Sequence, residues 1–210
     1  MTIDEARTAL LELERGPALR SDSFGPKQWV DNFQVADSAG RSRSHEVAWA
    51  LVHEGTPDER RYALDFWGAV SPPEGVSDAL AELYLGESPP DANLRGSIGQ
   101  YTGHRFSDDV GRKIAARFAS DPDGERDLAI NAVKFDPQGA AWDALIRLVL
   151  KTDDAVAIYR LFGAAYQAER SEDFFTAIKG KPPEVLTEIA GSVPLRLRAR
   201  FLQITGITYP

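Results

Sequence analysis

Apolar residues recur along most of this chain at spacings of three and four, which is the period of an α-helix with one buried face. Three such faces are formed by Val76, Leu80, Leu83 and Tyr84, by Val110, Ile114 and Phe118, and by Trp142, Leu145, Ile146 and Val149. Alternation of apolar and polar residues, which is typical of half-buried strands, does not stand out. The pattern predicts about twelve helices of roughly 9 to 16 residues, joined by links of roughly 3 to 6.

Residues that favour helix starts occur at intervals along this pattern. Thr2 and Glu5 match a capping box, in which a hydroxyl and a carboxylate each bind a free N–H group at the helix start. Thr56 with Pro57 and Glu59 is a stronger start, because proline at the first helical position loses no hydrogen bond. Further helix starts are expected at Ser44, Ser77, Ser107, Thr152 and Ser171.

A repeat connects these helix starts. Four hydroxyl residues lie 32 positions apart, each shortly before a predicted helix: Thr56, Ser88, Ser120 and Thr152. The run Asp78–Leu85 also resembles Asp143–Leu150, 65 positions later. Repetition at a fixed period is typical of stacked helical units, each of which buries its apolar face against its neighbours.

Two helices per roughly 32 residues, with a Pro-Asp opening and an alanine-rich first helix, resemble the HEAT-like repeat family over about 56–183. That family's usual repeat is nearer 40 residues, and tetratricopeptide repeats match the length better without their signature being legible here. The resemblance implies an all-α fold: a right-handed α-solenoid of about six stacked antiparallel helix pairs. We expect one domain over 1–210, with an N-terminal cap at 1–55 and a C-terminal cap at 184–210. Segment 16–43 is expected to hold a short helix flanked by loops.

Charge and composition narrow the function classes. The 210 residues include 24 Lys and Arg against 32 Asp and Glu, a net charge of −8, and no cysteine. Disulfides and thiolate metal sites are therefore excluded. The chain shows neither a signal peptide nor a membrane-spanning apolar run, so a cytoplasmic location is expected. Acidic charge repels phosphate backbones, which disfavours nucleic acid and favours a basic protein partner.

His45 and Glu46 are candidate residues of a catalytic zinc site. These residues begin like the H-E-x-x-H motif of zinc proteases, but Trp49 occupies the position of the second histidine. His53 lies two turns from His45, about 12 Å along a helix, so the two cannot share a zinc ion. No metal is expected, and these side chains are predicted to lie on a polar face.

Other candidate motifs have simpler structural explanations. Gly96 and Gly99 belong to a glycine-rich stretch that lacks the pattern of a phosphate-binding loop, so close helix packing is expected there. The acid pairs Asp108-Asp109 and Asp153-Asp154 follow hydroxyl residues, where they favour a helix N-terminus over acid–base catalysis. We therefore expect no cofactor and no enzymatic activity.

An enzymatic alternative comes from the bacterial HEAT-like alkylpurine DNA glycosylases. That resemblance implies a Trp, an Asp and an Arg beside the DNA, and this chain has Trp142, Asp143 and Arg147. However, Asp143 and Arg147 also fit an ion pair one helical turn apart. The four tryptophans, Trp142 included, are more often core residues than binding anchors.

The predicted protein-binding surface consists of charged stripes on successive second helices of the repeat. Its residues are Asp78, Glu82, Asp109, Lys113, Arg117, Asp143 and Arg147. The alternative is a solvated helix face stabilised by pairs one turn apart. Near the C-terminus, Arg196, Arg198 and Arg200 alternate with apolar residues, in a helix that is either a cap or held by the acidic N-terminal half.

These features favour a non-catalytic scaffold that binds another protein. A small, acidic, stand-alone helical chain resembles the immunity proteins with which bacteria neutralise secreted toxins, many of which are basic nucleases. A regulatory adaptor is an equal alternative within the same class, and a DNA glycosylase is the alternative outside it. The sequence does not predict an oligomeric state.

Overall fold

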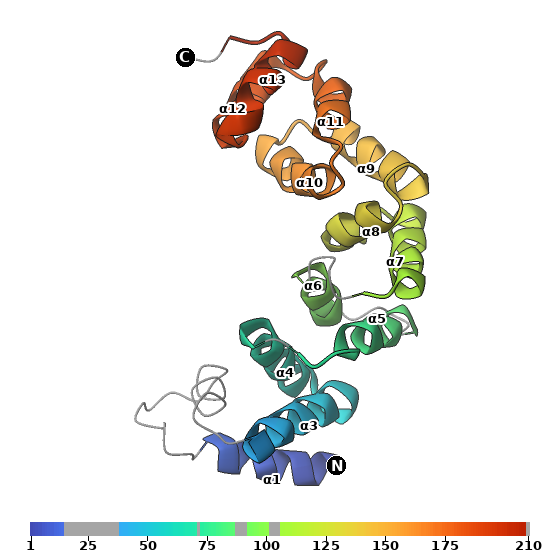
Figure 1. Cartoon of the computed structure of the whole chain (residues 1–210), viewed down its shortest axis with the longest axis vertical. Coiled ribbons are helices and arrows are strands. Elements are labelled where there is room, and N and C mark those ends of the chain that lie inside the picture. The colour runs from blue at the N-terminus through green and yellow to red at the C-terminus, as the bar shows by residue number, and fades with distance from the viewer. Residues whose placement is uncertain (15–37, 71, 87–91, 101–105, 209–210) are drawn as a thin grey trace. The chain divides into compact units, whose positions relative to one another are not determined.

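The computed structural model describes residues 1–14, 38–70, 72–86, 92–100 and 106–208. Within these residues the chain forms twelve α-helices and one 3-10 turn, with no strand, which confirms the all-helical prediction (Figure 1). The helices gather into two compact units, which we name the N-terminal unit (Met1–Tyr101) and the C-terminal unit (Thr102–Pro210).

The N-terminal unit is arranged around one long helix. Its elements are α1 (Ile3–Glu14), α3 (Ser38–Glu54), α4 (Pro57–Ala69), α5 (Val76–Gly86) and α6 (Ala92–Gln100). Helix α3 packs between α1 and α4, α4 also packs on α6, and α6 packs on α5 (Figure 1). Trp67, Phe66 and Leu51 are fully buried where α3 meets α4.

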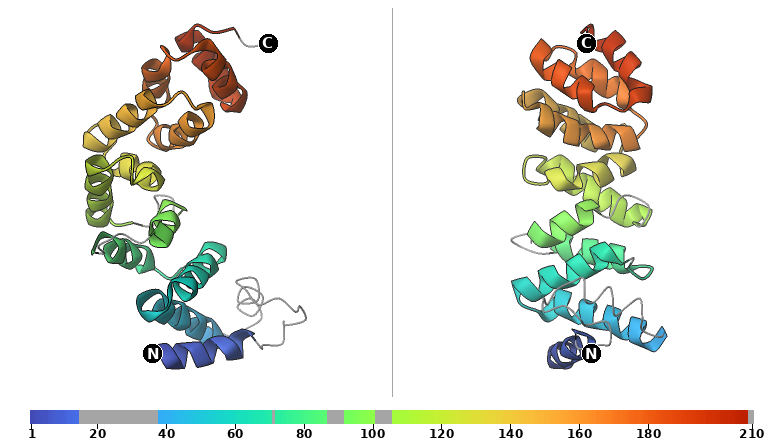
Figure 2. Two further views of the ribbon diagram at one scale, coloured as in Figure 1. Left: turned by 180° about the vertical axis from the view of Figure 1, so that it is seen from behind. Right: turned by 90° about the vertical axis from the view of Figure 1, so that its left-hand side faces the viewer.

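The C-terminal unit places its helices in two rows. Its elements are α7 (Asp108–Ser120), η1 (Arg126–Leu128), α8 (Ala129–Phe135), α9 (Ala140–Lys151), α10 (Ala155–Gln167), α11 (Ser171–Ile178), α12 (Pro183–Ser192) and α13 (Leu195–Thr205). Helices α7, α9, α11 and α13 pack successively in one row, and α8, α10 and α12 do so in the other (Figure 2). Each helix of a row therefore has the next helix of the same row as a neighbour.

Two helix starts follow the sequence rules closely. The Thr56 hydroxyl accepts from the Glu59 N–H, and the Glu59 carboxylate accepts from the Thr56 N–H at 2.8 Å. Thr2 and Glu5 form the same reciprocal pair at the start of α1. Glu59 also receives two hydrogen bonds from the Arg7 guanidinium, at 2.8 and 3.0 Å, so the cap of α4 is tied to α1.

Other predicted starts are wrong. Ser44 lies inside α3, which begins at Ser38, and Ser77 is the second residue of α5. Ser171 is the first helical residue of α11 and not its cap. At α10 the cap is Asp154, whose carboxylate accepts from the N–H groups of Val156 and Ala157, whereas Thr152 ends α9.

The 32-residue spacing places Thr56 and Thr152 shortly before α4 and α10, as expected, but it does not mark a helix cap at every position. Ser120 is the last residue of α7, and Ser88 lies outside the described residues. The 65-residue similarity holds better: Leu80 in α5 and its counterpart Leu145 in α9 are both completely buried. The right-handed solenoid of about six pairs stays a prediction. Most of segment 16–43 lies outside the described residues; its last part, from Ser38, belongs to α3.

Glycine contributes to close packing at one position of the C-terminal unit. A Cβ atom on Gly111 of α7 would lie within 2.3 Å of the Phe135 ring at the end of α8, so only glycine fits there. At Gly96 the expected close packing is wrong, because a Cβ there would meet no described atom within 4 Å. The surroundings of Gly99 lie outside what the structure describes.

The arginine-rich C-terminal helix is held by its own unit. Arg200 binds the Glu172 carboxylate of α11 through two hydrogen bonds, and Arg198 donates to backbone carbonyls at the end of α12. The Arg196 guanidinium lies 5.3 Å from the centre of the Tyr166 ring. Phe201 is completely buried and meets Phe175 edge to face. These contacts anchor α13 within the C-terminal unit.

Candidate functional site

The predicted surface residues fall in both units. Asp78, half-buried, and Glu82, exposed, lie one turn apart on α5 of the N-terminal unit, and the other five belong to the C-terminal unit. Asp143 and Arg147 are exposed on α9, but within the described residues they form no ion pair with each other. The predicted pair at this position is therefore wrong.

The predicted surface residues on α7 form ion pairs with each other or with other residues of the C-terminal unit. Lys113 lies 2.9 Å from Asp109, and the hydrogen bond from this lysine holds the pKa of the Asp109 carboxyl below its ordinary value. The Arg117 guanidinium donates to Glu125, a carboxylate that is almost completely buried, at 2.7 Å. Arg117 thus links α7 to the turn before α8.

Trp142 is a core residue covered by a cation. Its exposed fraction is 7%, and the Arg170 guanidinium lies 3.9 Å from the centre of its ring. Arg170 also donates to the Asp173 carboxylate at 2.7 Å and to the Pro137 carbonyl. Since arginine occupies the accessible side of this ring, Trp142 is not presented to a ligand.

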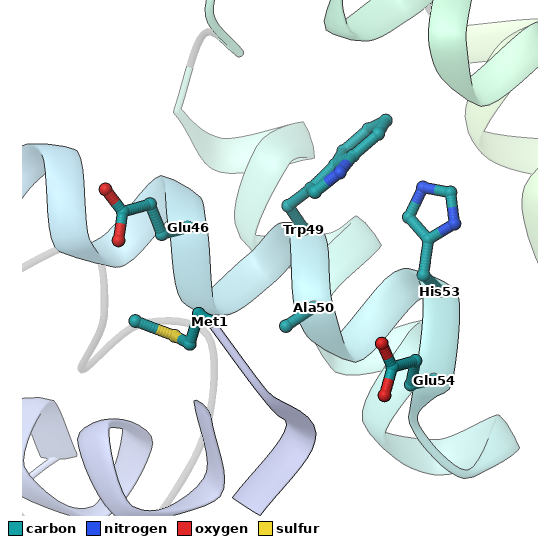
Figure 3. A pocket seen from close by; sticks show the side chains of 6 residues that line it. All are labelled: Met1, Glu46, Trp49, Ala50, His53 and Glu54. Carbon is teal, nitrogen blue, oxygen red and sulfur yellow. The ribbon is translucent and has the colours of Figure 1, made fainter. Parts of the chain in front are cut away.

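A pocket in the N-terminal unit has a different character. It is an open hollow of about 470 Å³ lined by Met1, Glu46, Trp49, Ala50, His53 and Glu54, which we name the Trp49 pocket (Figure 3). All of its lining residues except Met1 come from α3. Met1 reaches it from the start of α1, which packs against α3.

The helical period arranges the lining residues in two rows. Glu46, Ala50 and Glu54 follow one another at intervals of four, and Trp49 and His53 form the neighbouring row at the same interval. The small Ala50 side chain leaves room between the two carboxylates, which stand on either side of it (Figure 3). The Cα atoms of the two glutamates are about 12 Å apart along the axis.

Trp49 forms one wall of the pocket. The His53 ring lies 4.5 Å from it and the Trp67 ring 6.0 Å from it, both at tilted angles. Trp67 itself is fixed by a hydrogen bond from its indole N–H to His45 Nδ1 at 3.1 Å. Burial lowers the pKa of His45, which keeps this imidazole neutral and able to accept that bond. Trp49, unlike Trp67 and Trp142, keeps part of its surface accessible.

The pocket combines an accessible indole with carboxylates that have no cation. In the described part of the chain, neither Glu46 nor Glu54 forms an ion pair, and no lysine or arginine lies over Trp49. Among the same residues, no group of three or more His, Asp and Glu side chains is placed to hold a metal ion. The chemistry that the pocket offers is recognition of a positive group by charge and by an aromatic face.

The net charge is distributed unevenly between the two units. Residues 1–101 hold 17 Asp and Glu against 9 Lys and Arg, whereas residues 102–210 hold 15 of each. The whole net charge of −8 therefore resides in the N-terminal unit.

Comparison with protein-family models, curated proteins and solved structures gives no match. In the described part of the chain, every helix is too short or too polar to cross a bilayer.

Three of the six lining residues, Glu46, Trp49 and His53, are candidates from the sequence, which predicts no pocket there. His45, Glu46, Trp49 and His53 drew attention as an imperfect zinc motif, and Trp49 was expected in the core. The available signal was the spacing of two acids four positions on either side of Ala50, beside an aromatic pair one turn apart. Whether that face is accessible depends on how α1 and α4 pack against α3, which periodicity alone does not indicate.

Proposed function

We propose that this protein is a non-catalytic helical scaffold that binds a basic partner protein through its N-terminal unit. The observation that carries the proposal is the confinement of the net charge of −8 to residues 1–101. An acidic surface attracts a basic partner over a distance and raises the rate of association. The carboxylates of the Trp49 pocket, which form no ion pair within the described residues, support the same conclusion at short range.

The architecture suits a scaffold. In the C-terminal unit the two-row packing of α7 to α13 matches that of repeat proteins, which present side chains from successive helices on one surface. We propose that the predicted right-handed stack of about six HEAT-like pairs serves this role. Asp78 and Glu82 belong to the proposed binding surface; the predicted residues of the C-terminal unit lie where acids and bases balance.

The most specific form of this proposal is an immunity protein that neutralises a basic bacterial toxin. It draws its support from the small size, helical fold and acidic N-terminal unit, by analogy with proteins of that kind. A glycosylase is less well supported, because Arg170 covers Trp142 and neither unit carries a net positive charge for grasping DNA.

The test begins with capture of partners from the source cell by the purified chain, followed by reconstitution of each complex from purified components. We expect a stoichiometric complex with a basic protein, and an association rate that falls between about 50 and about 300 mM salt. If the partner is a toxin, adding the protein in equimolar amount abolishes its activity. Failure to reconstitute any complex would overturn the proposal.

Matched charge reversals locate the surface. Asp78→Lys with Glu82→Lys changes an acid pair one turn apart in the N-terminal unit, and Glu184→Lys with Glu188→Lys changes an equivalent pair on α12. We expect the first variant to slow association roughly tenfold and the second to have little effect. Equal effects would show that the partner does not select the N-terminal unit.

A further inference from the structure

The Trp49 pocket has the form of a receptor for one positively charged side chain. Ala50 is the smallest residue in its row and is flanked one turn away on each side by Glu46 and Glu54 (Figure 3). A planar group placed over Ala50 would lie next to the row of Trp49 and His53, with Glu46 one turn before it and Glu54 one turn after it.

Charge selects a cation over other occupants. Both carboxylates are exposed, and in the described residues no cation pairs with either of them. An anion would be repelled, and a purely apolar group would leave both carboxylates without any gain in hydrogen bonding. A cation pairs with the carboxylates and also interacts favourably with the negative face of the indole.

The C-terminal unit of the same chain shows which cation suits a tryptophan beside a carboxylate. The Arg170 guanidinium lies 3.9 Å from the Trp142 ring centre while its Nε binds the Asp173 carboxylate at 2.7 Å. A guanidinium is planar and donates in a fixed fork, so it stacks on an indole and binds a carboxylate at once. A lysine ammonium has no flat face with which to stack.

We propose that the Trp49 pocket binds an arginine side chain that projects from the partner protein. The guanidinium stacks on Trp49 above Ala50 and pairs with the carboxylate of Glu46 or of Glu54. This inference rests on the proposed function, since it assigns the partner's arginine to one place on the N-terminal unit. It goes beyond that function by naming the residue type that the pocket recognises.

The experiment uses the full chain labelled with ¹⁵N and three tripeptides: acetyl-Gly-Arg-Gly-amide, the lysine analogue, and the citrulline analogue, which is isosteric with arginine but neutral. The indole N–H signal of Trp49 is assigned from the Trp49→Phe variant. We expect the arginine peptide to shift that signal saturably, with a dissociation constant on the order of 1 mM. We expect weaker binding of the lysine peptide and no saturable shift with citrulline.

Two variants test the pocket without removing its tryptophan. Glu46→Gln with Glu54→Gln keeps the shape and removes the charge, and we expect it to weaken binding of the arginine peptide roughly tenfold. Ala50→Leu keeps the charge and fills the space, and we expect it to abolish the shift. Glu184→Gln with Glu188→Gln is the charge-matched control, which should bind as the wild type does. Thermal unfolding checks that each variant is folded.

The outcomes separate this inference from the proposed function. No movement of the Trp49 signal, equal binding of the lysine peptide, or wild-type binding by Ala50→Leu would each overturn the arginine assignment. In any of those cases, a salt-dependent complex with the reconstituted partner would still uphold the scaffold. If the arginine peptide binds at the pocket and no partner complex forms, the proposed function fails and the pocket assignment stands.

Discussion

The two units use their charged side chains in different ways. In the C-terminal unit, ion pairs join different helices or the turns between them: Arg117 with Glu125, Lys151 with Asp123, Lys181 with Asp153 and Arg200 with Glu172. In the described part of the N-terminal unit, Arg7 with Glu59 is a bond of this kind, while the acids outnumber the bases almost twofold. The charges of the C-terminal unit thus balance and include several ion pairs between its helices and turns, whereas the N-terminal unit carries an excess of acid.

The two tryptophans show the same contrast at the level of one residue. The Trp142 ring is buried and lies under the guanidinium of Arg170, which also forms an ion pair with Asp173. Trp49 is partly open and lies beside two carboxylates that form no ion pair with any described residue. Similar side chains can therefore be part of the core where the chain supplies the cation, as at Trp142, or remain partly accessible where the described residues supply none, as at Trp49.

The largest expected effect tests whether the units are separate. Leu80 and Leu145 are equivalent residues of α5 and α9, and both are completely buried. We expect each change to alanine to lower the free energy of unfolding by about 2–5 kcal/mol, through lost transfer energy and a residual cavity. Hydrogen exchange locates the damage: Leu80→Ala should speed exchange in α3 to α6, and Leu145→Ala in α7 to α11. Identical exchange patterns would mean that the two units unfold as one.

A smaller effect is expected for the cation over Trp142. Arg170→Ala removes the guanidinium from the indole and leaves the Pro137 carbonyl and Asp173 without their donor. We expect a loss of about 1–3 kcal/mol in urea unfolding and a red shift of Trp142 emission. Arg160→Ala, an exposed arginine on α10, is the control and should cost less than about 0.5 kcal/mol. Equal costs would show that the Arg170 contact contributes nothing.

The pH dependence compares two Arg–Glu bridges. The hydrogen bonds from Arg7, together with those at Thr56, lower the pKa of Glu59 from 4.5 to about 2. Because the folded pKa is depressed, the unfolded chain binds more protons in acid. The stabilisation is complete above pH 4.5 and is lost as pH falls toward 2.

We expect Glu59→Gln to cost about 1–2 kcal/mol at neutral pH, and its difference from wild type to shrink as the pH falls through that window. Glu172→Gln in the C-terminal unit removes a more exposed bridge to Arg200 and should have a smaller effect. Urea titrations at several pH values measure both. A cost of Glu59→Gln that does not change between pH 7 and acid would contradict the assignment.

What the sequence predicted correctly was local or periodic. The Thr56 capping box depends only on residues within four positions, and it formed as expected. The burial of Leu80, Leu145 and Ile114 follows from a period that any amphipathic helix imposes. The all-helical class followed from the same signals, summed over the chain.

What the sequence did not predict depends on contacts between distant segments. Arg170 and Trp142 are 28 positions apart, and nothing near either residue indicates their pairing. The Trp49 pocket exists because α1 brings Met1 to the edge of α3 and leaves the indole partly uncovered. At Gly96 no described atom lies close enough to require a glycine, because a glycine allows close packing but does not cause it.

The smallest expected effect on stability concerns the N-cap of α10. In the sequence Thr152-Asp153-Asp154, more than one side chain could serve as that cap. Asp154 accepts from two N–H groups of α10, whereas the Thr152 hydroxyl accepts only from the Asp154 N–H, at 3.1 Å. We expect Asp154→Ala to cost about 1 kcal/mol, as Thr56→Ala should in the N-terminal unit, and Thr152→Ala to cost a few tenths. Urea unfolding of the three variants measures these costs. If Thr152→Ala costs as much as Thr56→Ala, the hydroxyl caps α10 after all, and the helix starts of the two units would again follow one repeat.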